Sequence, residues 1–70
     1  MRNITIYCKP SLLETVKQLN VTYHDYLDEV EVILPYTKEV EDINNQDLSD
    51  EEFTNHFGLD YEQVNCIELI

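Results

Sequence analysis

The sequence predicts a small α+β domain, a β-α-β-β-α-β sandwich whose antiparallel-rich sheet carries two helices on one face. Several segments alternate apolar and polar residues with the period of a strand, and two others begin with helix-start signals. Hydrophobic residues make up 43% of the 70 residues and are spread along the whole length, which is typical of a folded chain. We therefore expect a single acidic domain over residues 1–70, like a compressed ferredoxin-like unit.

The first strand and helix follow each other directly. Residues Arg2–Cys8 alternate between an apolar side, formed by Ile4, Ile6 and Cys8, and a more polar side, so they predict a strand. Pro10 ends this strand. Ser11 and Glu14 have the spacing of a capping box, in which each side chain satisfies a backbone N–H group at the helix start. A helix to about Leu19 is the resulting expectation.

A hairpin is predicted next. Residues Val21–Tyr26 and Glu29–Leu34 both alternate with period two, and Leu27-Asp28 separates them as a turn without the usual glycine. One side of the second strand is apolar, whereas the other carries Glu29 and Glu31. The hairpin is therefore expected to present an acidic face.

The second half of the chain begins with a polar stretch. Residues 36–47 predict the longest loop and the most mobile part of the molecule. Ser49 and Glu52 then form a second capping box, which starts a helix that Phe57 completes. Gly58, the only glycine, has the position of the left-handed residue that ends a helix.

The tail allows two interpretations. A strand at Val64–Leu69 is favoured because the segment is short and contains β-branched residues. A second helix starting at Asp60 would instead give a loose helix-turn-helix pattern with Phe53 and Phe57. Its recognition positions contain no Lys or Arg to contact phosphate, so DNA binding is not expected in either case.

The charge of the chain is unevenly distributed. Residues 1–20 hold three basic side chains and one acidic side chain, whereas residues 21–70 hold fourteen acidic side chains and one lysine. A negative field of this kind repels nucleic acid and anionic membranes and attracts basic proteins. We expect a basic protein partner, with no direct binding to nucleic acid or membrane.

Chemistry-bearing residues are sparse. The acid-rich segment from Asp42 does not fit a calcium loop, because Asp47 stands at the glycine position and Phe53 at the final glutamate position. His24 and His56 lie in no nucleophile motif. We expect no catalytic residue, no metal and no cofactor, and therefore a protein that is not an enzyme.

The two cysteines and the N-terminus bear on the cellular compartment. Cys8 and Cys66 have apolar neighbours and are interpreted as reduced, buried thiols. The sequence contains neither a signal peptide nor an apolar run long enough to span a membrane. These features predict a cytoplasmic protein.

The favoured hypothesis is an inhibitor that occupies the basic groove of a nucleic-acid enzyme or nuclease complex by mimicking nucleic acid. In size and composition, though in no motif, the chain resembles the anti-CRISPR, uracil-glycosylase-inhibitor and anti-restriction proteins of phages and other mobile elements. Tyrosines supply contact area and carboxylates pair with Lys or Arg. The expected partner-binding residues are Tyr23, Asp25, Tyr26, Asp28, Glu29, Glu31, Glu39, Glu41 and Asp42. Asp47, Asp50 and Glu51 would extend the field. The alternative is an oligomerising scaffold or adaptor module, such as a homodimer, whose acidity serves solubility.

Overall fold

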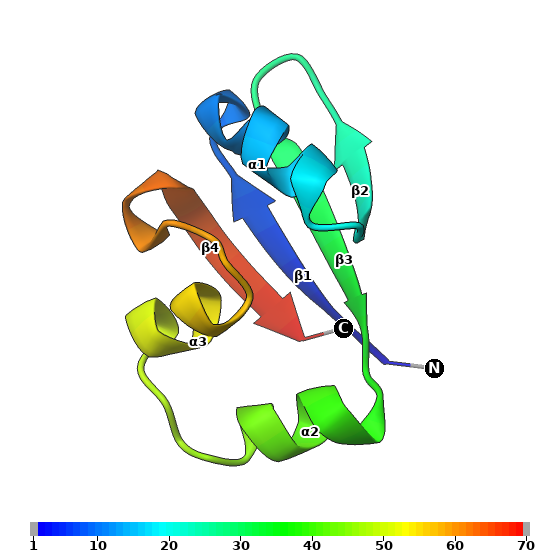
Figure 1. Cartoon of the computed structure of the whole chain (residues 1–70), viewed down its shortest axis with the longest axis vertical. Helices are drawn as coiled ribbons and strands as arrows, with labels where there is room; N and C mark the ends of the chain where they lie inside the picture. Colours follow the sequence, from blue (N-terminus) through cyan, green and yellow to red (C-terminus); the bar gives the residue numbers. More distant parts are fainter. Residues whose placement is uncertain (1, 70) are drawn as a thin grey trace.

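Four strands form one antiparallel sheet in the order β2-β3-β1-β4, accompanied by three α-helices, in the computed structural model, which describes residues 2–69 (Figure 1). The strands are β1 (Asn3–Cys8), β2 (Thr22–Asp25), β3 (Val30–Pro35) and β4 (Val64–Leu69). The helices are α1 (Leu13–Gln18), α2 (Lys38–Asn44) and α3 (Asp50–His56), with short 3-10 turns η1 (Pro10–Leu12) and η2 (Tyr61–Gln63). The predicted α+β class is confirmed, but the chain has one more helix than the sequence predicts.

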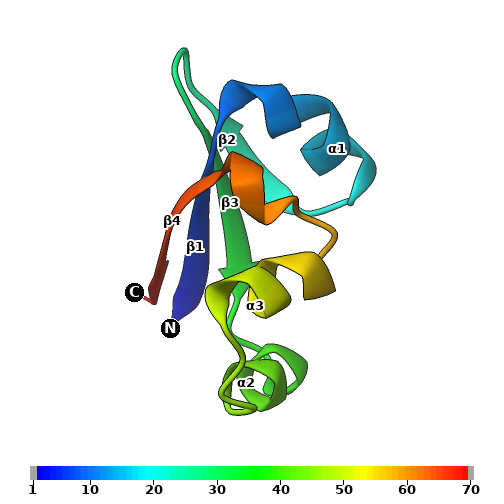
Figure 2. The same ribbon diagram turned by 90° about the vertical axis from the view of Figure 1, so that its left-hand side faces the viewer.

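The two central strands build the core. In the antiparallel pair of β1 and β3, Ile6 lies opposite Val32, and the apolar pairs on either side of it are also buried. These side chains point to one side of the sheet, where α1 contributes Val16 and α3 contributes Phe53. Figure 2 shows α1 and α3 on that same side. None of the described helices lies over the other side of the sheet (Figure 2).

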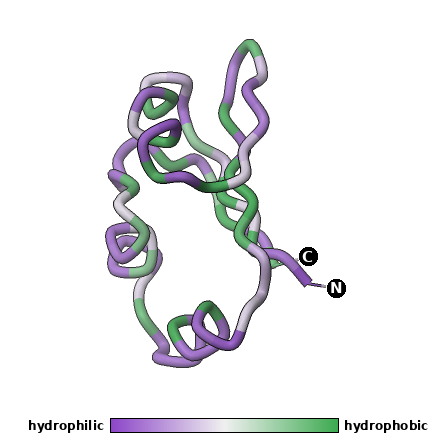
Figure 3. The backbone as a smooth tube through the Cα atoms, turned by 45° about the vertical axis from the view of Figure 1, so that its right-hand side comes forward, coloured by the Kyte–Doolittle hydropathy of each residue, from purple (hydrophilic) through white to green (hydrophobic). Residues whose placement is uncertain are grey.

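The hairpin of β2 and β3 has a tight connection. The N–H group of Tyr26 donates to the carbonyl of Glu29 over 2.9 Å, so Leu27 and Asp28 form the turn between them, as the sequence predicts. β2 is two residues shorter than the predicted strand. The hairpin projects beyond the body of the molecule (Figure 3).

The tail is a strand, as favoured from the sequence. Asp60 caps η2, because its side chain accepts from the N–H of Glu62 over 3.1 Å. β4 then pairs antiparallel with β1 and forms an edge of the sheet. The helix-turn-helix alternative is wrong, since a single 3-10 turn replaces its second helix.

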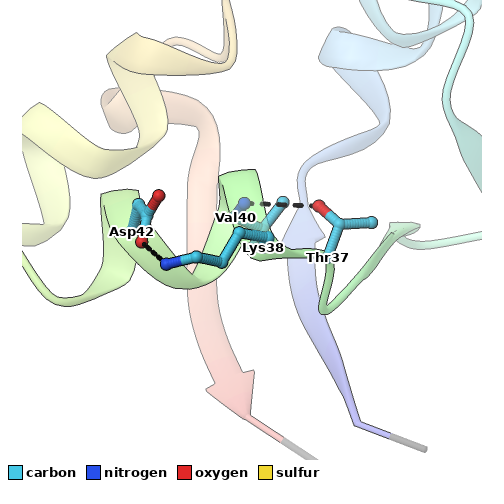
Figure 4. Close-up of polar contacts among 4 residues, drawn as sticks. All are labelled: Thr37, Lys38, Val40 and Asp42. Atoms are coloured by element: carbon cyan, nitrogen blue, oxygen red, sulfur yellow. Dashed lines mark hydrogen bonds and ion pairs between the residues drawn. The ribbon is translucent and has the colours of Figure 1, made fainter.

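The prediction of a mobile loop over residues 36–47 is also wrong, because α2 lies within it. Thr37 caps this helix by accepting from the N–H of Val40 over 3.3 Å, and Lys38 pairs with Asp42 at 2.8 Å (Figure 4). Val40 and Ile43 are buried in the core. Two apolar residues three apart, combined with a threonine cap and one ion pair, are enough to stabilise a short helix against the core.

The start of the first helix differs from the predicted capping box. Pro10 begins the turn η1, so Ser11 lies inside that turn and has no N–H group to cap. Its hydroxyl instead bonds to the side chain of Gln63, which precedes β4. Ser11 therefore joins two distant segments of the chain.

The predicted start and end of α3 are confirmed. The hydroxyl of Ser49 accepts from the N–H of Glu52 over 3.2 Å. At the other end Gly58 has a φ of 81°, its N–H donates to Asn55, and the next N–H donates to the carbonyl of Thr54. These are the two bonds of a Schellman motif, which requires a left-handed residue at the position of the glycine.

The packing of α2 gives a direct test of the fold. Replacing Ile43 by Ala removes buried methyl and methylene groups, so we expect the free energy of unfolding to fall by about 2 to 5 kcal/mol in urea titrations followed by circular dichroism. Ile43→Val should cost only about 0.5 to 1.5 kcal/mol. The exposed control Glu39→Ala should have little effect. An Ile43→Ala protein as stable as the control would mean that α2 does not pack on the core.

Candidate functional site

None of the described helices covers the side of the sheet opposite α1 and α3 (Figure 2). We call it the open face. It comprises the outward-facing strand residues Asn3, Thr5, Tyr7, Thr22, His24, Glu31, Ile33, Cys66 and Glu68. It contains no Lys or Arg. The carboxylates of Glu31 and Glu68 therefore have no Lys or Arg beside them in the strands, and the cross-strand neighbour of Glu31 on β2 is His24. Solvated surfaces normally mix the two signs of charge.

Two rows of side chains cross this face. The register places His24, Glu31, Tyr7 and Cys66 side by side across all four strands. In the next row Thr5 lies between Ile33 and Glu68. The sheet therefore brings acidic residues from β3 and β4 to both sides of Tyr7, although Glu68 is 61 residues away from it in the chain.

Tyr7 is the centre of this acidic group. Its hydroxyl lies 3.5 Å from a carboxylate oxygen of Glu68. The pKa of the Tyr7 phenol is raised above its ordinary value by desolvation and then by the negative charges around it, those of Glu68 and Glu31 being the strongest and that of Glu29 contributing as well. Each of these causes disfavours the phenolate. Tyr7 is therefore a neutral hydrogen-bond donor inside a negative field.

The open face continues into the tip of the hairpin. Tyr26 and Glu29 follow the outward side of β2 and β3, and the rings of His24 and Tyr26 lie 6.2 Å apart. Asp28 lies in the turn, exposed, beside a leucine, Leu27, that is entirely exposed. Residues two apart on a strand are separated by about 6.8 Å, so Glu29 and Glu31 place two carboxylates next to each other on the outward side, before Ile33.

The structure divides the predicted binding residues into groups. Tyr26, Asp28, Glu29 and Glu31 belong to the hairpin tip and the open face. Tyr23 points to the opposite side of the sheet and packs against the core. It is therefore a packing residue and not a free anchor.

The remaining predicted residues lie elsewhere. Asp25 is on the covered side of the sheet but is exposed, because it lies at the end of β2 beside the tip. Glu39, Glu41 and Asp42 are on α2, which follows the opposite end of β3 (Figure 1). Asp42 is already paired with Lys38. The length of β3 thus separates the acids of α2 from those of the hairpin.

The two cysteines have different environments. Cys8 is buried, and burial raises the pKa of its thiol to about 11, as expected for a packing residue. Cys66 is exposed on the open face, so its interpretation as a buried thiol is wrong. The reason is its place on the outward side of an edge strand, which apolar sequence neighbours alone do not reveal.

The sequence patterns do not identify four surface residues of the open face and the hairpin tip: Tyr7, Leu27, Cys66 and Glu68. The period-two pattern of residues 2–8 already places Tyr7 outward. The neighbourhood of Glu68, by contrast, follows only from the pairing of β4 with β1. No local signal connects the two ends of the chain.

The described residues offer little for small-molecule chemistry. They enclose no pocket, and no three of their His, Cys, Asp or Glu side chains gather as a metal site. None of their helices has the length and apolar character needed to cross a membrane. Open four-stranded sheets with aromatic residues can stack RNA bases, but the carboxylates around Tyr7 would repel the phosphates.

Comparison with known proteins gives no match: no protein-family model, no curated protein and no solved structure resembles the chain.

The charges around Tyr7 can be measured. Removing the nearest carboxylate with Glu68→Gln should lower the pKa of Tyr7 towards its ordinary value, because the phenolate then meets less negative charge. The pKa is read from an NMR titration in which Tyr7→Phe assigns the ring signals. Glu39→Gln on α2 is the matched control and should leave the pKa unchanged. Equal pKa values in both variants would contradict the proximity of Glu68 to Tyr7.

Proposed function

We propose that this protein is an acidic inhibitor that binds the basic groove of a nucleic-acid enzyme or nuclease complex, with its open face and hairpin tip in the place of the nucleic acid. The observation that carries the proposal is the set of carboxylates on a sheet face without Lys or Arg: Glu31 on β3, Glu29 just before it at the hairpin tip, and Glu68 on β4. A groove lined with Lys and Arg for phosphate would accept these negative charges.

The location of the other charges supports the same surface. The described ion pairs, Lys17 with Glu14 and Lys38 with Asp42, lie on α1 and α2. No cation of the described residues pairs with a carboxylate of the open face. No Lys or Arg of the described residues therefore neutralises those carboxylates before a partner binds. The net charge of −11 also steers a basic protein towards the molecule.

The architecture also supports a binding role. We interpret it as a β-α-β-β-α-β unit, like a compressed ferredoxin-like unit, with α2 inserted before α3. In such a unit the helices stabilise one face of the sheet, so the residues of the other face are free to serve recognition. Glu31 and Tyr7 on the open face contribute no contact to the apolar core.

The proposal is tested with the protein immobilised and exposed to a lysate of the cells that encode it, followed by elution in a salt gradient. We expect a nucleic-acid enzyme to elute at moderate salt. The variant Glu29→Gln with Glu31→Gln should bind this partner roughly tenfold more weakly, with a smaller dependence on salt. A matched control, Glu39→Gln with Glu51→Gln, removes the same charge from the helical side and should bind like the unmodified protein.

A competition experiment tests whether the protein mimics nucleic acid. Duplex DNA or RNA added to the complex should displace the protein, because both ligands would occupy one groove. Stable binding of both at once would contradict mimicry. Unchanged affinity of the Glu29 and Glu31 variant, with its fold intact by circular dichroism, would exclude the hairpin from the contact.

A second candidate function is self-association through β4. This strand is an edge of the sheet, and Leu69 and Cys66 on it are exposed. Free edges pair readily with other strands. A self-associating chain would sediment as a larger species when salt screens its like charges, whereas a mimic would stay monomeric at all salt concentrations until a basic partner is added. Sedimentation velocity at low and high salt therefore separates the two.

A further inference from the structure

The hairpin tip carries an apolar side chain for which the fold gives no reason. Leu27 has 102% of its reference surface exposed, and its neighbour Tyr26 has 48% exposed. A leucine in water contributes nothing to the core, and its position is one where Gly, Asn, Asp, Ser or Pro would favour the turn. Tyr26 and Leu27 together expose two adjacent large apolar side chains on the projecting turn, and exposed apolar surface rimmed by polar residues is a candidate contact site for a partner.

The turn holds this leucine at the front of the projecting hairpin. The bond from the N–H of Tyr26 to the carbonyl of Glu29 closes the turn at 2.9 Å. Neither residue of the turn has a positive φ, since the described non-glycine residues with that conformation are Asn20 and Asp47. Both turn residues thus have backbone conformations that any L-residue can adopt. Figure 3 shows the hydrophobic tip of the hairpin standing clear of the other elements.

We propose that Leu27 is the hydrophobic anchor of the partner contact and enters a shallow apolar pocket whose rim carries Lys or Arg. This inference rests on the proposed function, because the partner it describes is the same basic protein. The charges around the tip define the rim: Asp25, Asp28 and Glu29 lie within two residues of Leu27 and are not buried. An apolar side chain surrounded by polar contacts that exclude water is the usual arrangement at the centre of an interface.

The same carboxylates make contact with an anionic membrane or with a second copy of the tip unfavourable. An anionic membrane surface would repel a tip with three acids beside its leucine. A second copy of the chain would bring two such tips together with the same sign of charge. A basic protein is the partner for which both the leucine and the acids are favourable.

The test compares Leu27→Ser with the conservative variant Leu27→Met. Because Leu27 is fully exposed, neither should change the stability of the fold. Poly-L-lysine serves as a basic probe without a pocket, and both variants should bind it as the unmodified protein does. Towards the basic partner recovered by the immobilised protein, Leu27→Ser should lose about 10- to 100-fold in affinity, as for an apolar side chain that is buried on binding. Leu27→Met should lose much less.

Three different outcomes would overturn the proposal. If the unmodified protein recovers no basic partner, the proposed function fails together with the anchor. If it recovers one and Leu27→Ser binds that partner as tightly as the unmodified protein, the anchor alone fails and the acidic surface stands. Binding to neutral phosphatidylcholine vesicles that is lost in Leu27→Ser would also overturn it, because the leucine would then enter a lipid surface.

Discussion

The antiparallel pairing of β1 with β3 is the constraint on which the rest of the structure depends. It places Ile4, Ile6 and Cys8 beside Leu34, Val32 and Val30, so that one side of the central strands is continuously apolar and buried. A 70-residue chain buries only about 60% of its unfolded surface, and it has few ways to assemble a core. Every helix contributes its apolar residues to this one side. On the opposite side of the same strands, which none of the described helices covers, Thr5 is buried whereas Tyr7 and Glu31 stay partly exposed.

That difference between the two sides links the core to the function we propose. Side chains of a strand alternate between its faces, so the residues between the buried ones must point to the open face. In β3 these are Glu31 and Ile33, and in β1 they are Thr5 and Tyr7. The acidic face is therefore fixed by the same register that forms the core. A shift of the register by one residue would bury Glu31 and expose Val32, which the core does not permit.

The acids of the chain have different duties once they are placed in the fold. Asp50, Glu51 and Glu52 lie in the first turn of α3, where the helix dipole favours negative charge. Asp42 forms an ion pair, and Asp60 caps η2. Those of the hairpin tip and the open face make no such local contribution. The projecting hairpin carries both carboxylates without a local structural role and the exposed Leu27. For this reason we propose that the partner binds there.

Several secondary-structure elements of this fold can be predicted from the sequence alone. Local patterns were sufficient for β1, for the hairpin, for the start of α3 at Ser49 and for its end at Gly58, because alternation, capping and a left-handed glycine act within a few residues. They were insufficient for α2, whose two apolar residues gain their stability only from burial in the core. They were also insufficient for the surface around Tyr7. Glu68 reaches Tyr7 because β4 pairs with β1, and Ser11 meets Gln63 for the same reason. Contacts between residues more than fifty positions apart depend on strand order and register, and only the tertiary structure decides these.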